Sequence, residues 1–206
     1  MVRQLVEFEM NADKEDVLHD KNTLSLDGES CFHFASAGGS LQVCKYLLDE
    51  AGLERRLLKE GNKDLTTPLH WAAGSGSVEV MRWLAEEHNC SVNTKNAFGC
   101  TAAHFAASAG QIETLQYLQS VGADLTLENF HGHDPVTKAV AYKRNDALLW
   151  LLQQLPESYS RVAVGKRVRW SEQPGGEETM IPLQQIASIV GNSEAIHILS
   201  QHSQLT

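Results

Sequence analysis

One pattern constrains the fold of this chain more than any other feature: a segment of about ten residues recurs at intervals of 33 to 37 residues. It reads SCFHFASAGG at residues 30–39, TPLHWAAGSG at 67–76, TAAHFAASAG at 101–110 and, more loosely, DPVTKAVAYK at 134–143. A unit of this length is too thin to bury an apolar face alone, so such units become stable by stacking on their neighbours. The spacing therefore predicts an array of similar units.

Each copy has the start and stop signals of a short helix. Ser30, Thr67, Thr101 and Asp134 stand at the position of a helix N-cap, where a side-chain oxygen accepts a free amide of the first turn. Proline follows in two copies, as suits a first helical residue. Gly39, Gly76 and Gly110 are typical of the left-handed residue that ends a helix, and Lys143 takes that place in the fourth copy. Apolar residues then recur at intervals of three and four, which predicts a second, half-buried helix.

The intact motif of residues 67–72, TPLHWA, together with this spacing, resembles the ankyrin-repeat family. The resemblance implies an all-α solenoid of stacked helix-turn-helix units, and the residue pattern described below adds a β-hairpin insertion near the C-terminus. It also implies that His33, His70 and His104 are structural and form hydrogen bonds within the neighbouring turn. We expect one domain over residues 1–206. Its parts are an N-terminal capping helix (1–24), four repeats (25–60, 61–95, 96–128 and 129–155), an insertion (156–180) and a degenerate capping repeat (181–206).

The insertion interrupts the rhythm of the repeats. Val162, Val164, Val168 and Trp170 alternate with polar or small residues around Gly165 and Lys166, which predicts two strands that meet in a projecting hairpin. This finger is basic and carries Arg161, Lys166, Arg167 and Arg169. Two interpretations stay open at this point. The cations protect a solvated hairpin edge from aggregation, or they dock an acidic or phosphorylated partner.

In the ankyrin-repeat family, partners usually meet the turn tips and the face of the first helices. The resemblance implies the following partner-binding residues here: Asp64, Thr66, Phe98, Phe130, His131, His133 and Tyr142. Exposed aromatic side chains are enriched at protein interfaces, so the aromatic tips are the first candidates for a binding hot spot. Alternatively, Phe98 and Phe130 fold back on neighbouring tips and stabilise them.

Composition and motifs exclude several other functions. A formal net charge of −9 makes nucleic acid an unlikely partner, and no apolar run is long enough to span a membrane. His131, His133 and Asp134 supply too few ligands for a metal, since Asp134 is already needed as a helix cap. The four cysteines have no disulfide or zinc spacing, which favours a reducing cytoplasmic or nuclear location.

No catalytic motif is present in the sequence either, so we expect neither enzymatic activity nor a cofactor. The sequence therefore predicts a non-enzymatic protein–protein interaction module, an adaptor, inhibitor or scaffold, whose partner is another protein or peptide. The alternative is a regulatory module whose basic finger recognises a phosphorylated or acidic peptide, a lipid or a nucleic acid.

Overall fold

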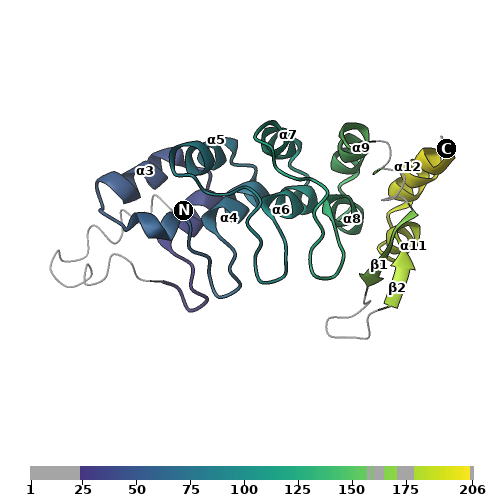
Figure 1. Ribbon diagram of the computed structural model, residues 1–206, viewed down its shortest axis with the longest axis horizontal. Helices are drawn as coiled ribbons and strands as arrows, with labels where there is room; N and C mark the ends of the chain where they lie inside the picture. Colours follow the sequence, from purple (N-terminus) through teal and green to yellow (C-terminus); the bar gives the residue numbers. More distant parts are fainter. Residues whose placement is uncertain (1–23, 157–158, 160–164, 171–178, 205–206) are drawn as a thin grey trace. The chain divides into compact units, whose positions relative to one another are not determined.

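A computed structural model describes residues 24–156, 159, 165–170 and 179–204 of the chain. These residues fall into two compact units, with the boundary between Ala97 and Phe98, and each unit has its own core. The helices are short and come in pairs, and a small two-stranded sheet lies near the C-terminus (Figure 1). This confirms the predicted fold class. The expected capping helix of residues 1–24 lies, apart from its last residue, outside the described residues.

The first unit contains two helix pairs and a single helical turn between them. Its elements are α2 (Cys31–Ala37), α3 (Leu41–Asp49), η1 (Arg55–Leu58), α4 (Pro68–Ser75), α5 (Val78–Arg82) and a π-helical turn, η2 (Trp83–Glu87). The first helices α2 and α4 pack against each other, and so do the second helices α3 and α5. The core is formed by fully buried side chains such as Phe32, Leu69, Met81 and Leu84.

The second unit repeats this arrangement and adds the sheet. Its elements are α6 (Ala102–Ala109), α7 (Ile112–Ser120), α8 (Pro135–Ala141), α9 (Asn145–Gln154), β1 (Arg167–Trp170), β2 (Thr179–Pro182), α11 (Leu183–Ile189) and α12 (Ser193–Gln204). The first helices pack in the order α6, α8, α11, and the second helices in the order α7, α9, α12. In Figure 1, α7 and α9 form a row above α6 and α8.

Three first helices begin with the same reciprocal capping arrangement. At α4, the hydroxyl of Thr67 caps the first turn, and the backbone N–H of Thr67 donates to Nδ1 of His70 over 3.1 Å. Ser30 with His33 and Thr101 with His104 repeat it. Because Nδ1 accepts, the proton sits on Nε2, which donates to a backbone carbonyl of the following turn: Thr66 for His33 and His133 for His104. The predicted structural role of these histidines is confirmed.

The helix ends follow the sequence signals, with one strained exception. Gly76 and Gly110 take the left-handed conformation at φ of 78° and 80°. Lys143 occupies the same phase of the fourth repeat and has φ of 56°, a conformation that costs a residue with a Cβ about 1–2 kcal/mol. The fourth repeat therefore keeps the backbone path of the others without the residue that favours it.

The predicted hairpin is present, and the strand that pairs with Val168 and Trp170 follows them in the sequence. Val168 and Trp170 lie in β1 as expected. Their antiparallel partner is β2, with Val168 opposite Ile181, whereas Val162 and Val164 lie outside the described residues. The turn therefore does not fall at Gly165 and Lys166. The apolar faces of Val168 and Ile181 are both buried, and the sheet packs on α11, which begins directly after β2. The described part of the hairpin thus packs on the first helix of the C-terminal pair.

Candidate partner-binding surface

The loops that precede the first helices form tips whose backbone is fixed by a single side chain. The Oδ1 atom of Asn62 accepts the backbone N–H groups of Asp64 and Thr66, over 3.1 and 3.0 Å. In the second unit, Oδ1 of Asn129 accepts those of His131 and His133 in the same way. Such side-chain turns hold a loop in one conformation without a ligand.

Neighbouring tips are also joined by a backbone hydrogen bond. In the first unit, the N–H of Lys63 donates to Asp27 O over 2.9 Å, and that of Ala97 donates to Asp64 O over 2.7 Å. In the second unit, the N–H of Phe130 donates to Phe98 O over 3.0 Å. Within each unit the tips are therefore held side by side, and their backbone loses little further freedom on binding.

The aromatic residues predicted to bind a partner are largely accessible. Phe98 is 49% exposed, Phe130 is 65% exposed and Tyr142, at the end of α8, is 56% exposed. Phe130 also leans on its neighbour: a Cβ placed on Gly99 would lie only 3.0 Å from Phe130 Cδ1. Phe130 thus supports the adjacent tip, as the alternative interpretation proposed, and still presents most of its surface to solvent.

One of the two residues predicted at the second tip has other surroundings than expected. Asp64 is exposed at its tip, but Thr66 is 6% exposed, and its hydroxyl accepts a hydrogen bond from Asn96 Nδ2 over 3.1 Å. Its carbonyl is the acceptor for His33. Thr66 therefore holds the turn together through its hydrogen bonds to Asn96 and His33. Because these bonds bury it below the tip, it offers little surface to a partner.

His131 and His133 share the fourth tip and are both half-buried. The ring of His133 lies 6.0 Å from those of His131 and Trp170, and its Nε2 donates to Arg169 O over 2.5 Å. Burial lowers the pKa of His133, against the opposing effect of this hydrogen bond, and the nearby Lys138 and His131 lower the pKa further. A neutral His133 therefore ties the fourth tip to β1.

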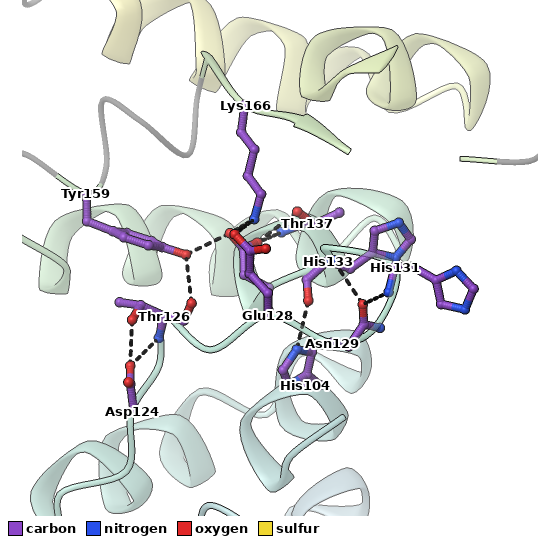
Figure 2. A network of polar contacts seen from close by, with 11 residues as sticks. His104, Asp124, Thr126, Glu128, Asn129, His131, His133, Thr137, Tyr159 and Lys166 are labelled. Atoms are coloured by element: carbon purple, nitrogen blue, oxygen red, sulfur yellow. Dashed lines mark hydrogen bonds and ion pairs between the residues drawn. The ribbon is translucent and has the colours of Figure 1, made fainter. Parts of the chain in front are cut away.

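A buried polar network anchors the segment before β1 to the fourth repeat (Figure 2). The Oδ1 atom of Asp134 caps α8 by accepting the N–H and hydroxyl of Thr137. Its Oδ2 accepts the Tyr159 hydroxyl over 2.7 Å and the Lys166 ammonium over 3.1 Å. Lys166 also pairs with Glu128 over 2.7 Å. Lys166 was expected on an exposed basic finger, but its side chain is only 14% exposed and its charge is already neutralised.

The network keeps Asp134 ionised in a buried position. Burial alone would raise its pKa, but the Lys166 charge and the hydrogen bonds from Thr137 and Tyr159 outweigh burial and lower the pKa below its ordinary value. The same environment raises the pKa of Tyr159, through burial first and the Asp134 charge second. Both groups therefore keep their protonation state across the neutral range.

The other residues of the predicted basic finger are distributed differently. Arg169 is exposed, and Arg167 is exposed with its Nη2 donating to Met180 O over 2.6 Å. Arg161 lies outside the described residues. Among the described residues of the predicted finger, Arg167 and Arg169 thus remain as accessible cations. They lie on the same face of β1 because they are two residues apart.

Sequence reasoning missed several exposed apolar side chains of the first unit. Leu26 and Leu65 lie at the tips and are 91% and 58% exposed. On α2, Phe34 is 46% exposed, and its ring packs edge-on against Trp71 at a centroid distance of 5.5 Å. The available signal was the phase of the repeat, since Leu65 takes the tip position that glycine holds at Gly28, Gly99 and Gly132. The tips of both units thus carry large apolar side chains.

Among the described residues, no group of three or more histidine, cysteine, aspartate or glutamate side chains is placed to hold a metal ion. In the same part of the chain, no helix has the length and hydropathy to cross a bilayer. The candidate surface therefore consists of tips with a fixed backbone and exposed apolar side chains.

Comparison with known proteins agrees with this arrangement. The family model for ankyrin repeats, in three copies, matches residues 1–96 and 88–161. The chain belongs to the ankyrin-repeat family. Ankyrin repeats generally mediate protein–protein interactions and are not a family of enzymes.

Several curated relatives of this ankyrin-repeat chain are similar in sequence. A 26S proteasome non-ATPase regulatory subunit 10 from Dictyostelium discoideum is 34% identical over 47% of this chain and 40% of the relative. A probable 26S proteasome regulatory subunit p28 from Saccharomyces cerevisiae is 32% identical over 66% of this chain and 58% of the relative. The human transient receptor potential cation channel subfamily A member 1 is 34% identical over 49% of this chain but 8% of its own length. The chain thus spans about half the length of the proteasome relatives it matches.

Proposed function

We propose that this chain is a non-enzymatic interaction module that binds a partner protein through the tips and first-helix face of its repeats. The observation that supports this most directly is the exposure of Phe98, Phe130 and Tyr142 on a backbone that is already rigid. Exposed aromatic groups on a preorganised scaffold gain apolar burial at a small entropic cost, which favours binding. A cytoplasmic or nuclear location is part of this proposal, and four free cysteines are compatible with it.

The proteasome relatives suggest the first partner to test. Two of the similar proteins carry names of 26S proteasome regulatory subunits, so we propose that this chain acts as an adaptor on that assembly. Immobilised chain should retain purified 26S proteasome or one of its isolated regulatory subunits. Absence of binding to the complete assembly and to each isolated subunit would contradict this choice of partner, and the surface would still be open to test with peptides.

The surface is tested by the double substitution Phe98→Ala with Phe130→Ala. We expect the affinity for the retained partner to fall by at least about tenfold, because the aromatic side chains of two adjacent tips are removed. A matched control replaces Tyr46 and Val121, which are 38% and 36% exposed but belong to second helices, on α3 and directly after α7. Circular dichroism checks that helicity is intact. Equal affinity of the Phe98/Phe130 variant and the wild type would remove the aromatic tips from the proposal.

The alternative function, recognition of phosphate or acidic groups by a separate basic finger, has weaker support. Lys166 is neutralised by Asp134 and Glu128, and the hairpin packs on α11. Replacing Arg167 and Arg169 by glutamate in the same binding assay separates the two functions. A loss confined to this variant, with the tip variant unaffected, would favour the finger.

A further inference from the structure

We infer that the fourth repeat and β1 form a cationic surface, made by Lys138, Tyr142, Arg167 and Arg169, that binds an acidic segment of a partner protein. This inference rests on the proposed function and specifies the chemistry of the partner.

The charge of this region is opposite to that of the protein. Residues 130–170 contain seven lysines and arginines and three acidic residues, whereas the whole chain has a formal net charge of −9. Of the three acidic residues, Asp134 is buried beneath Lys166 and Asp146 lies at the start of α9, while Glu157 is outside the described residues. The accessible charge of the region is therefore positive.

His133 brings the two halves of the cationic surface together. Its Nε2 binds the carbonyl of Arg169 on β1, and Lys138 on α8 lies close enough to influence its charge state. Lys138 and Tyr142 are one helical turn apart, with the N–H of Tyr142 bonded to Lys138 O over 3.0 Å, so both side chains lie on the same side of α8.

The network around Asp134 preserves this positive charge (Figure 2). Lys166 pairs with the two carboxylates that flank the fourth tip in the sequence, Asp134 and Glu128. Neither carboxylate is then left to neutralise Lys138 or Arg169, and within the described residues neither cation forms an ion pair. Tyr159 and Lys166 also fix the chain just before β1, which positions the two arginines.

The available donors match a carboxylate better than an extended polyanion. A guanidinium presents paired N–H donors that fit a carboxylate, and the neighbouring Tyr142 and Phe130 offer exposed apolar area for the side chains beside it. A nucleic acid would extend past this small surface onto an acidic protein that repels it. A short partner segment that combines aspartate or glutamate with apolar residues fits both features.

The test selects ligands from a phage-displayed library of random dodecapeptides on the immobilised chain. We expect the selected peptides to be enriched in aspartate and glutamate next to apolar residues. The substitution Lys138→Glu with Arg169→Glu should abolish that enrichment and lower the affinity of a selected acidic peptide, measured by fluorescence anisotropy, by at least about tenfold. Raising the salt concentration from about 50 to about 500 mM should weaken the binding of the same peptide, because salt screens the interaction between exposed charges.

A matched control reverses Lys45 and Lys59 in the first unit, which changes the net charge equally and should leave the selected sequences unchanged. Thermal melts verify that each variant is folded. Selection of neutral apolar peptides, sensitive to Phe98→Ala with Phe130→Ala, would overturn this inference and leave the proposed function standing. Tighter binding of a single-stranded DNA oligonucleotide than of the acidic peptides would also overturn it.

Discussion

Asp134 illustrates how one residue can change the role of a repeat position. The other repeats cap their first helix with a hydroxyl, at Ser30, Thr67 and Thr101. A hydroxyl has one oxygen, whereas a carboxylate has two, so Asp134 caps α8 with Oδ1 and reaches Tyr159 and Lys166 with Oδ2. The substitution of the cap residue thus provides the anchor for the segment that follows the fourth repeat.

We predict that Asp134→Ala destabilises the protein by about 2–4 kcal/mol, because it removes the cap of α8 and the buried carboxylate beside Lys166, which then keeps only the more exposed Glu128 as its partner. Asp134→Thr restores the capping hydroxyl and should recover about 1 kcal/mol of this loss. Urea unfolding followed by circular dichroism measures both free energies. Equal stability of wild type and Asp134→Ala would show that the network contributes nothing to folding.

The contribution of Asp134 should also depend on pH. Its pKa is lowered in the folded state, so the unfolded chain binds the proton more readily. The stabilisation is therefore complete above the ordinary pKa of 3.8 and is lost as the pH falls through the lower folded pKa. The free-energy difference between wild type and Asp134→Ala, measured in urea at several pH values, should be constant near neutrality and shrink below a pH of about 4. A difference that shrinks already near neutral pH would contradict this assignment.

At the scale of elements, each helix is short and depends on its neighbours. The first helices have seven or eight residues, which is too few for a helix to be stable alone in water. Capping histidines join three of the first helices, α2, α4 and α6, to the next turn, and the apolar faces of adjacent pairs form the core. Stability of these elements therefore comes mainly from packing between repeats.

Leu84 tests this dependence on packing. It is 0% exposed within η2, so we expect Leu84→Ala to lower the free energy of unfolding by about 2–5 kcal/mol, through lost burial and the cavity that remains. Leu26→Ala removes the same atoms from a side chain that is 91% exposed and should change stability by less than about 0.5 kcal/mol. Thermal and urea unfolding of the two variants give the comparison. Similar losses from both would mean that Leu84 is not part of the core.

At the scale of the whole molecule, the two compact units each combine a buried apolar interior with tips that expose apolar side chains. Such an arrangement supports recognition of a partner's surface. The four cysteines differ in exposure, so their reactivity can be used to test the packing of the units. Cys44, Cys90 and Cys100 are buried, and Cys31 is exposed. Burial raises the pKa of both the Cys44 and the Cys90 thiol to about 11.

Thiol labelling therefore gives a prediction for the intact protein. A thiol reacts as its thiolate, so buried thiols with a raised pKa react slowly. We expect a colorimetric disulfide reagent to modify one thiol rapidly in the native protein, at Cys31, and four after unfolding in urea. Cys31→Ser should remove the fast phase. Rapid reaction of several thiols under native conditions would show that the units open more readily than their packing indicates.

The sequence by itself determined the repeats, their family and the caps that begin each first helix. These features depend on local rules: hydroxyl or carboxylate caps, glycine at positive φ, and apolar spacing that is repeated and therefore reinforced from copy to copy. The exposure of Phe98, Phe130 and Tyr142 agreed with their phase in the repeat.

Only the tertiary structure decided which strand pairs with β1, that Thr66 is buried, and that Lys166 lies against Asp134 and Glu128. These outcomes depend on contacts between segments that are more than ten residues apart in the sequence. An alternating pattern determines which side of a strand is apolar. Which strand pairs with β1, and which helix covers the apolar side, depends on the packing against α11. A charge in the sequence likewise does not reveal whether folding will neutralise it, because that depends on the position of its counter-charge in space.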